Sequence, residues 1–460
     1  MGSTFEISTD ILPCKSVTYF YLLCALILGI SISCFLVSSL AFGLGFFFLI
    51  FLCIYSVAFG MKASLFLLIL LRICLDAFHK ELSVPLLEFK TLSLPSMVGI
   101  LILVAGVFYI MLRKVSFWRF PLVKPFGLFF FGCLLSLPFS DSLGQSITEM
   151  AELLSFVVLF ILIVDSLRTE KDIKRMVSFL VLSSLVPLSV GLVQVCSNFD
   201  LSVVSLEPSF RVSATLTHPN AYAFYLVMII VLSVSLFFQT KSEIHKAGLF
   251  VLIALLLISL VFTYTRSAWI GLVMAVLSMG VLQSRKLLIF APIALYGIIL
   301  IFPFISQRID PIFNPELFRY TSLAWRIELW GASIPYFLSH PIFGNGFGTF
   351  QLIGFQIDDW FAAAHNDYLR LLVETGIIGL SGFLILLVSL ARLGIKARRK
   401  ATDRYFGYIT TGFVCFLSAY VLMSFTDNLF NHGGVQWYFW AYAGVIASII
   451  RLKKGGREGA

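Results

Sequence analysis

The feature that most constrains this chain is a recurring pattern of long apolar runs joined by short polar connections. An apolar segment of about 20 residues can cross the hydrocarbon core of a bilayer as a helix. Because a run of about 16 residues also suits a tilted or re-entrant helix, we predict twelve to fourteen transmembrane helices. The fourteen candidate runs lie near residues 18–38, 42–60, 63–78, 96–113, 123–139, 147–166, 176–196, 219–238, 247–265, 268–283, 287–304, 371–391, 406–426 and 435–451.

The composition supports this interpretation. Hydrophobic residues make up 59% of the 460 residues and charged residues only 12%, whereas a typical soluble domain is about 25% charged. The chain lacks the polar surface of a water-soluble globule, and its apolar content excludes intrinsic disorder. We therefore predict an all-α, polytopic helical membrane protein. The eight cysteines lie in or beside apolar runs, without metal-type spacing, so neither disulfides nor a metal site are expected.

The basic residues predict how the chain is oriented, because lysine and arginine favour cytoplasmic loops. If the runs alternate from a cytoplasmic N-terminus, 24 of the 33 basic residues fall on the inner side and eight on the outer side, while Arg72 lies within a run. Both termini are then cytoplasmic. This asymmetry accounts for most of the net charge of +9, so nucleic acid is not an expected partner. The outer residues are Lys80, Lys90, Arg211, Arg266, Arg308, Arg319, Arg326 and Arg370.

One connection is much longer than the others. Residues 305–370 are less apolar, and the alternation puts them outside, where loops of this length are often functional. A helix is expected near 318–338. The glycine-rich segment 344–350 lacks the lysine and the preceding strand of a phosphate-binding loop, so a tight turn is favoured. We divide the chain into N-terminal membrane helices (1–204), a core that includes the loop (205–392), and C-terminal helices with a tail (393–460).

Two outer arginines lie at the ends of apolar runs. Arg211 precedes a predicted helix start at Pro219, where proline fits the first turn and Thr217 or His218 would be the cap. Arg266 lies at the tip of a tight hairpin. Either arginine alone is compatible with a side chain that reaches to the membrane surface. The two together favour an anion site, because a guanidinium group pairs with phosphate through two hydrogen bonds.

The end of the long loop supplies a third candidate. His365 falls where a helix enters the membrane, and Arg370 is spaced to meet Asp367 and Glu374 on one helical face. A satisfied histidine at the start of an amphipathic helix is one interpretation. The other is that His365 acts as a general base or hydrogen-bond donor at the membrane surface. His432, in the short outer loop 427–434, is a further candidate for the same site.

These motifs resemble those of the O-antigen ligase and polymerase superfamily. The segment 365–379, with its histidine–asparagine pair and Glu374-Thr375-Gly376, is similar to the end of the large periplasmic loop in that family. Arg211 with 218–220 is similar to its arginine before a His-Pro-Asn helix start. Residues 265–267 resemble its Thr/Ser-Arg-Ser/Gly element, and the turn at 344–346 is similar too. The resemblance covers about residues 205–392.

The resemblance implies an inner-membrane glycosyltransferase that takes a glycan from undecaprenyl pyrophosphate on the periplasmic face, without a metal or cofactor. Arg211 and Arg266 would then hold the pyrophosphate, and His365 would orient or deprotonate the acceptor hydroxyl. Further substrate contacts are expected from the residues beside these motifs, namely His218, Asn220, Asn366 and Arg370. The expected partners are the carrier-linked donor, a glycan acceptor and membrane lipids.

The acceptor separates the members of this superfamily, and these residues do not name it. An O-antigen ligase, which transfers to the lipid A core, is favoured over an O-antigen or exopolysaccharide polymerase. A transporter or lipid flippase is the rival from another class, but it would have charges or broken helices near the membrane centre. A scaffold for an envelope complex is a second rival, which transferase measurements would distinguish.

Overall fold

The computed structural model describes residues 61–76, 83–87, 90–197, 210–289, 292–293, 314, 321–357, 363–401 and 403–455. The predicted runs near 18–38 and 42–60, and most of the run at 287–304, lie outside these residues. The described helices are α3 (Met61–Leu75), α4 (Leu94–Leu112), α5 (Val123–Ser136), α6 (Leu143–Ser166), α7 (Glu170–Leu182), α8 (Leu185–Ser197), α9 (Pro219–Gln239), α10 (Glu243–Val261), α11 (Arg266–Leu282), α15 (Ser322–Ser339), α16 (Phe350–Ile357), α17 (Asp367–Lys400), α18 (Arg404–Met423) and α19 (Gly433–Gly455).

The helical membrane fold expected from the apolar runs is confirmed. Six described helical segments are long and apolar enough to cross a membrane: α6, the segment Glu170–Ser197 formed by α7 and α8, α9, α10, α17 and α18. Three shorter apolar helices accompany them, at Ser96–Leu112, Val123–Phe139 and Arg266–Leu282. The sequence did not predict the small antiparallel hairpin of β1 (Ser83–Leu87) and β2 (Lys90–Ser93), in which Ser83 pairs with Ser93.

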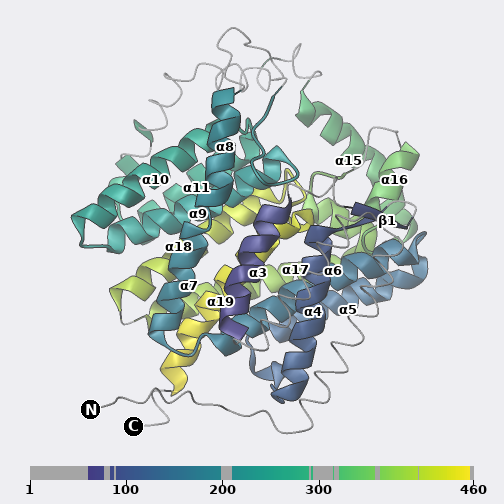
Figure 1. Ribbon diagram of the computed structural model, residues 1–460. Helices are drawn as coiled ribbons and strands as arrows, with labels where there is room; N and C mark the ends of the chain where they lie inside the picture. The colour runs from purple at the N-terminus through teal and green to yellow at the C-terminus, as the bar shows by residue number, and fades with distance from the viewer. Residues whose placement is uncertain are drawn as a thin grey trace.

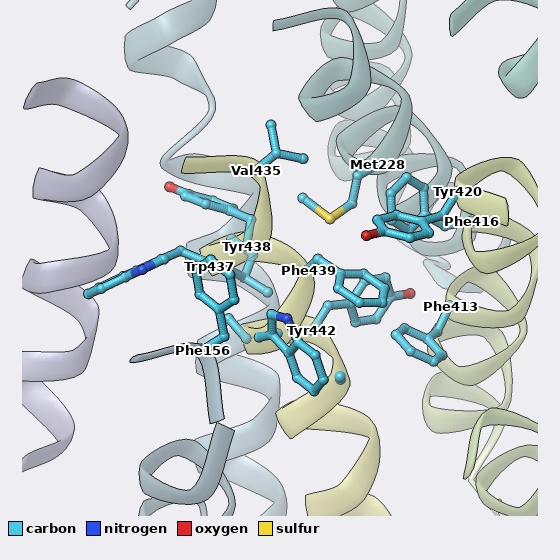
Figure 2. Packing of buried hydrophobic residues seen from close by; sticks show 14 of the residues in the cluster. Phe156, Met228, Phe413, Phe416, Tyr420, Val435, Trp437, Tyr438, Phe439 and Tyr442 are labelled. Carbon is cyan, nitrogen blue, oxygen red and sulfur yellow. The ribbon is translucent and has the colours of Figure 1, made fainter. Parts of the chain in front are cut away.

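The core is organised around α19. Figure 1 shows α17 and α19 in the middle of the molecule, with α9, α10 and α11 on one side and α4, α5 and α6 on the other. Trp437, Tyr438 and Trp440 are each at most 1% exposed. The Tyr438 hydroxyl donates to Ser183 at 2.9 Å. The ring of Phe439 stacks on that of Tyr420 at 4.8 Å (Figure 2). Aromatic packing of this kind adds to the stabilisation that burial alone provides.

Helix α17 is broken at Gly376, which has φ 61° and ψ −166°. The break frees backbone groups that a buried chain must satisfy, and the glycine-rich turn of the long loop satisfies them. The amides of Asn345 and Gly346 donate to the carbonyls of Val373 (3.0 Å) and Glu374 (2.9 Å), while the Ile377 amide donates to the Pro341 carbonyl (3.0 Å).

The turn itself requires glycine. Gly344, Gly346 and Gly348 all have φ between 78° and 104°, a region that glycine enters without a steric cost. A Cβ on Gly344 would lie 2.3 Å from the Glu374 backbone. The predicted tight turn is therefore present, and it fastens the long loop to α17. The helix expected near 318–338 is α15, so the turn also fixes where α15 ends.

Candidate functional site

A polar pocket of about 370 Å³ lies where α9, α11 and α17 begin and α18 ends. It brings together five of the seven predicted site residues, although they are up to 154 positions apart in the sequence. Its walls also include part of α15, so the long loop covers one side of the pocket. The lining residues are Arg211, His218, Asn220, Tyr264, Thr265, Arg266, Ser267, Ile270, Ser322, Leu323, Trp325, Arg326, His365 and Thr426.

Arg211 is held in place by the start of α9 and by the turn before α11. Its Nε donates to the Thr263 carbonyl at 2.9 Å, and one terminal nitrogen donates to Asn220 Oδ1 at 2.7 Å and to Thr265 Oγ1 at 3.1 Å. The turn is tight because Tyr264 adopts φ 53°. These three partners are neutral acceptors that orient the guanidinium group.

Arg266 is the first residue of α11, and its guanidinium group donates to Ser322 Oγ at 2.9 Å. Ser322 is the first residue of α15, so this hydrogen bond connects the membrane helices to the long loop. The N-terminus of a helix carries a partial positive charge. The position therefore combines a guanidinium group with a helix end that also favours an anion.

His365 adopts φ 48°, which is uncommon for a residue with a side chain. Its Nδ1 lies 3.3 Å from Asp427 Oδ1. Burial opposes ionisation of Asp427, but the hydrogen bond from His365 and the nearby imidazole of His432 outweigh it and hold its pKa well below the usual range. An ionised carboxylate can only accept, so Nδ1 of His365 must carry the hydrogen. In neutral His365, Nε2 is then the basic nitrogen.

Asp427 is itself positioned by a network that crosses three helix ends. Its Oδ2 accepts a short hydrogen bond from Asn220 Nδ2, and Nε2 of His432 lies 3.8 Å from Oδ1. The side chain of Asp427 is only 4% exposed. Because Asn220 also accepts from Arg211, one chain of contacts joins the pyrophosphate candidate Arg211 to the base candidate His365.

His218, one of the two residues predicted as the cap, caps α9. Its Nδ1 accepts from the Asn220 amide at 3.1 Å, so a neutral His218 carries its hydrogen on Nε2. The ring lies 6.4 Å from that of His432, almost parallel to it. Partial burial of the ring is the main cause that lowers the pKa of His218, and the neighbouring His432 adds to it. Because the side chain is also partly exposed to solvent, screening by water limits the size of this shift.

Two predicted site residues do not line the pocket. Asn366 caps α17 by accepting from the Leu369 amide at 3.0 Å. Arg370 is 2% exposed and donates to Glu374 at 3.0 Å, with Glu149 at 3.5 Å. The predicted i, i+4 pair of Arg370 with Glu374 is confirmed. Arg370 borders a separate cavity of about 70 Å³, so its position favours a structural role.

Three residues of this region, Arg326, Trp325 and Asp427, were not among the predicted site residues. Arg326 lines the pocket, where it donates to the Thr426 carbonyl at 2.6 Å and lies over the Trp325 ring at 5.7 Å. It was counted among the eight outer basic residues, which is the same signal that singled out Arg211 and Arg266. Trp325 also meets His365 edge to face at 5.4 Å. Asp427 was not selected, because the contacts that place it at the site come from Asn220 and His365, which are distant in sequence.

Within the described ranges, no group of three or more His, Cys, Asp or Glu side chains is arranged to hold a metal ion. Cys74, Cys133, Cys196 and Cys415 are free thiols in the structure. The remaining cysteines, Cys14, Cys24, Cys34 and Cys53, lie outside the described residues.

The fold and the pocket define a class: a multi-pass helical membrane protein with an arginine-rich pocket where several helices begin. Residues 249–384 match the family described as O-antigen ligase, which is the resemblance that the motifs indicated. Arg266, Arg326 and His365 lie inside the matched segment, and Arg211 and Asp427 lie outside it.

A curated relative agrees with this assignment. The chain is 25% identical over 182 residues to a protein of Rickettsia bellii (strain RML369-C) described as "Putative polysaccharide ligase". The match covers 36% of this chain and 41% of the relative, so the chain spans about two fifths of that protein's length.

Proposed function

We propose that this protein is an inner-membrane glycosyltransferase. It moves a glycan from undecaprenyl pyrophosphate to an acceptor on the periplasmic side, and the favoured activity is that of an O-antigen ligase with the lipid A core as acceptor. The single observation that carries the proposal is that Arg211, Arg266 and His365 line one cavity. A pocket for a diphosphate and a hydroxyl needs this combination of fixed cations and a base.

In the proposed reaction, the acceptor hydroxyl oxygen bonds to the anomeric carbon of the donor while the bond from that carbon to the pyrophosphate oxygen breaks. The hydroxyl proton passes to Nε2 of His365, and undecaprenyl pyrophosphate leaves with the bonding electrons. Asp427, already ionised, stabilises the positive charge that His365 gains. This arrangement is the general-base chemistry of a histidine oriented by a carboxylate.

The leaving pyrophosphate gains negative charge as the bond breaks, and the arginines are arranged to stabilise it. Arg211 and Arg266 are held by neutral oxygen acceptors, and Arg326 adds a third guanidinium group to the same wall. Fixed charges are most effective in a site with little water, where no reorganisation is needed. The carrier's activated bond supplies the free energy, so the proposed reaction requires no metal or cofactor.

The sidedness of the proposal is supported by the distribution of basic residues. The candidate pocket opens at the helix ends that the charge asymmetry assigns to the periplasm, and the termini are assigned to the cytoplasm. The rival transporter is less well supported, because the pocket residues gather at helix ends and not at helix centres. A polymerase of the same superfamily remains the alternative, since it would use the same donor chemistry.

The test is transfer by the purified full-length protein from an undecaprenyl-pyrophosphate glycan. Transfer to lipid A core but not to a second carrier-linked glycan would establish a ligase, and chain extension would establish a polymerase. No transfer to any acceptor would contradict the proposal.

The matched variants are Arg266→Ala in the pocket and Arg285→Ala, which is exposed at the other end of α11. We expect Arg266→Ala to lower the transfer rate by about 10²-fold or more, the loss typical when one charge-stabilising donor is removed. Arg285→Ala should retain full activity. Undiminished activity in Arg266→Ala would argue against a role for Arg266 in the reaction.

A further inference from the structure

A second pocket, lined by basic and aromatic residues, lies at the opposite end of α9 from the candidate site. The pocket has a volume of about 550 Å³ and includes Phe237, Phe238, Lys241, Lys246 and Arg404. These residues come from the end of α9, the start of α10 and the start of α18. Since α9 has 21 residues that each rise about 1.5 Å, the two pockets are about 30 Å apart along the helix.

The charges of this basic pocket are mostly uncompensated by its own contacts. Arg404 is held by neutral partners: it donates to the Phe238 carbonyl at 3.4 Å and to the Tyr408 hydroxyl at 3.2 Å, and it lies over the Tyr408 ring at 5.3 Å. Lys246 pairs with the exposed Glu243 at 2.7 Å. The lining therefore offers three cations with one paired carboxylate beside them, which suits an anionic group.

The neighbouring face of α10 is apolar and poorly covered by protein. Only 22% of the apolar window of α10 is buried, compared with 78% in α9. Ile244, Phe250 and Val251 are 77%, 65% and 55% exposed. In a membrane protein, such a face packs against acyl chains. The structure thus joins a cationic pocket to a lipid-facing helix surface.

We propose that this basic pocket binds the headgroup of an anionic phospholipid, with its acyl chains along α10. Basic pockets between transmembrane helices recognise anionic headgroups in this way. The continuity with the apolar face of α10 favours a lipid over a free phosphate ion. The proposal is independent of the glycosyltransferase chemistry, because none of its residues lines the candidate site.

The experiment measures lipid retention by native mass spectrometry of the full chain in detergent, titrated with phosphatidylglycerol. The variant Lys241→Gln/Arg404→Gln removes two cations from the pocket. The control Arg285→Gln/Lys286→Gln removes two exposed cations from the turn after α11, away from this pocket. Each cation near an anionic lipid contributes about fivefold in affinity, so the pocket variant should bind phosphatidylglycerol on the order of 25-fold more weakly, and the control should be unchanged.

Two further ligands identify the source of the phosphate. Phosphatidylcholine, with its zwitterionic headgroup, and glycerol phosphate, without acyl chains, should both fail to compete at the concentrations that saturate phosphatidylglycerol. Equal loss in both double variants, equal binding of phosphatidylcholine, or competition by glycerol phosphate would each overturn the proposal. If Lys241→Gln/Arg404→Gln does not fold, Lys241→Gln/Lys246→Gln leaves α18 unaltered and carries the same expectation.

Discussion

At the scale of single residues, the pocket depends on how each charged group is held. In the proposed reaction His365 acts as the base because Asp427 fixes its hydrogen on Nδ1, and Asp427 is in turn held by Asn220. Arg211 shares that asparagine. One amide therefore positions both halves of the proposed machinery, and the conformations of Arg211 and His365 are coupled through it.

We predict that Asp427→Asn lowers kcat by about 10²- to 10⁴-fold with little change in KM for the donor. An asparagine can no longer stabilise a protonated His365, and it does not enforce the tautomer that leaves Nε2 basic. The measurement is steady-state transfer with the carrier-linked donor. Asp427→Glu should recover part of the rate, because it restores the negative charge. Equal losses in both variants, with lowered thermal stability, would indicate a purely structural role.

A pH prediction follows from His218. Its pKa is lowered in the folded protein, whereas an unfolded histidine titrates near 6.5. Below about pH 6.5 the unfolded state therefore binds more protons than the folded state, and stability falls as the pH decreases. Asp427 affects stability only at lower pH. Because its pKa is lowered in the folded protein, the stability that its ionised form provides is lost only below the pH range in which an ordinary carboxyl group titrates.

The thermal unfolding midpoint of the wild type should thus decrease from pH 7 to pH 5. In His218→Gln the decrease should be smaller, since that variant has no ring to protonate. His245→Gln, at an exposed position on α10, is the control and should behave like the wild type. A pH profile in His218→Gln as steep as that of the wild type would refute the assignment.

At the scale of elements, the site depends on the break in α17. Without the break, the amides of Asn345 and Gly346 would have no carbonyls to meet, and the turn would not fasten α15 above the pocket. Helix α15 carries Ser322, Trp325 and Arg326, so the geometry of the wall is set by backbone hydrogen bonds beyond the pocket itself.

We expect Gly376→Ala to destabilise the protein by about 3 kcal/mol. The backbone of this residue, with φ 61° and ψ −166°, lies in a region essentially restricted to glycine, which costs a side chain about 1–3 kcal/mol, and a Cβ would lie 2.3 Å from the Ile342 carbonyl oxygen. Transfer activity should decrease as well, because α15 would shift. The control is Gly248→Ala on α10, where a Cβ would meet nothing within 4 Å. A stabilisation of roughly 0.5–1 kcal/mol is expected there, measured by thermal unfolding in detergent.

At the scale of the whole molecule, the chain separates two kinds of charge. In the proposed topology, most basic residues lie at the cytoplasmic helix ends, as the bilayer favours, whereas the arginines of the pocket gather at the periplasmic ends. Because a cation on the outer side is disfavoured by topology, its presence there requires another reason. In this chain that reason is the proposed anionic substrate.

This orientation can be tested by labelling single cysteines in a cysteine-free variant with a membrane-impermeant maleimide. Gly331→Cys on α15 should react in cells whose inner membrane is intact, once the reagent reaches the periplasm. Lys286→Cys, in the turn after α11, should react only after that membrane is permeabilised. The reverse pattern would invert the proposed topology and would place the pocket in the cytoplasm.

The sequence alone determined the membrane class, most helix positions and the identity of the main pocket residues. These features have local causes: apolar runs must span a bilayer, Pro219 starts a helix, and Arg211 and Arg266 oppose the charge asymmetry. The Arg370–Glu374 pair was predictable from its spacing, but the tertiary structure was needed to show that Arg370 lies outside the pocket beside Glu149, and that Asp427 and Arg326 belong to the site. The reason is physical: a charged group takes its role from the partners within a few ångströms, and here those partners are supplied by helix ends distant in sequence.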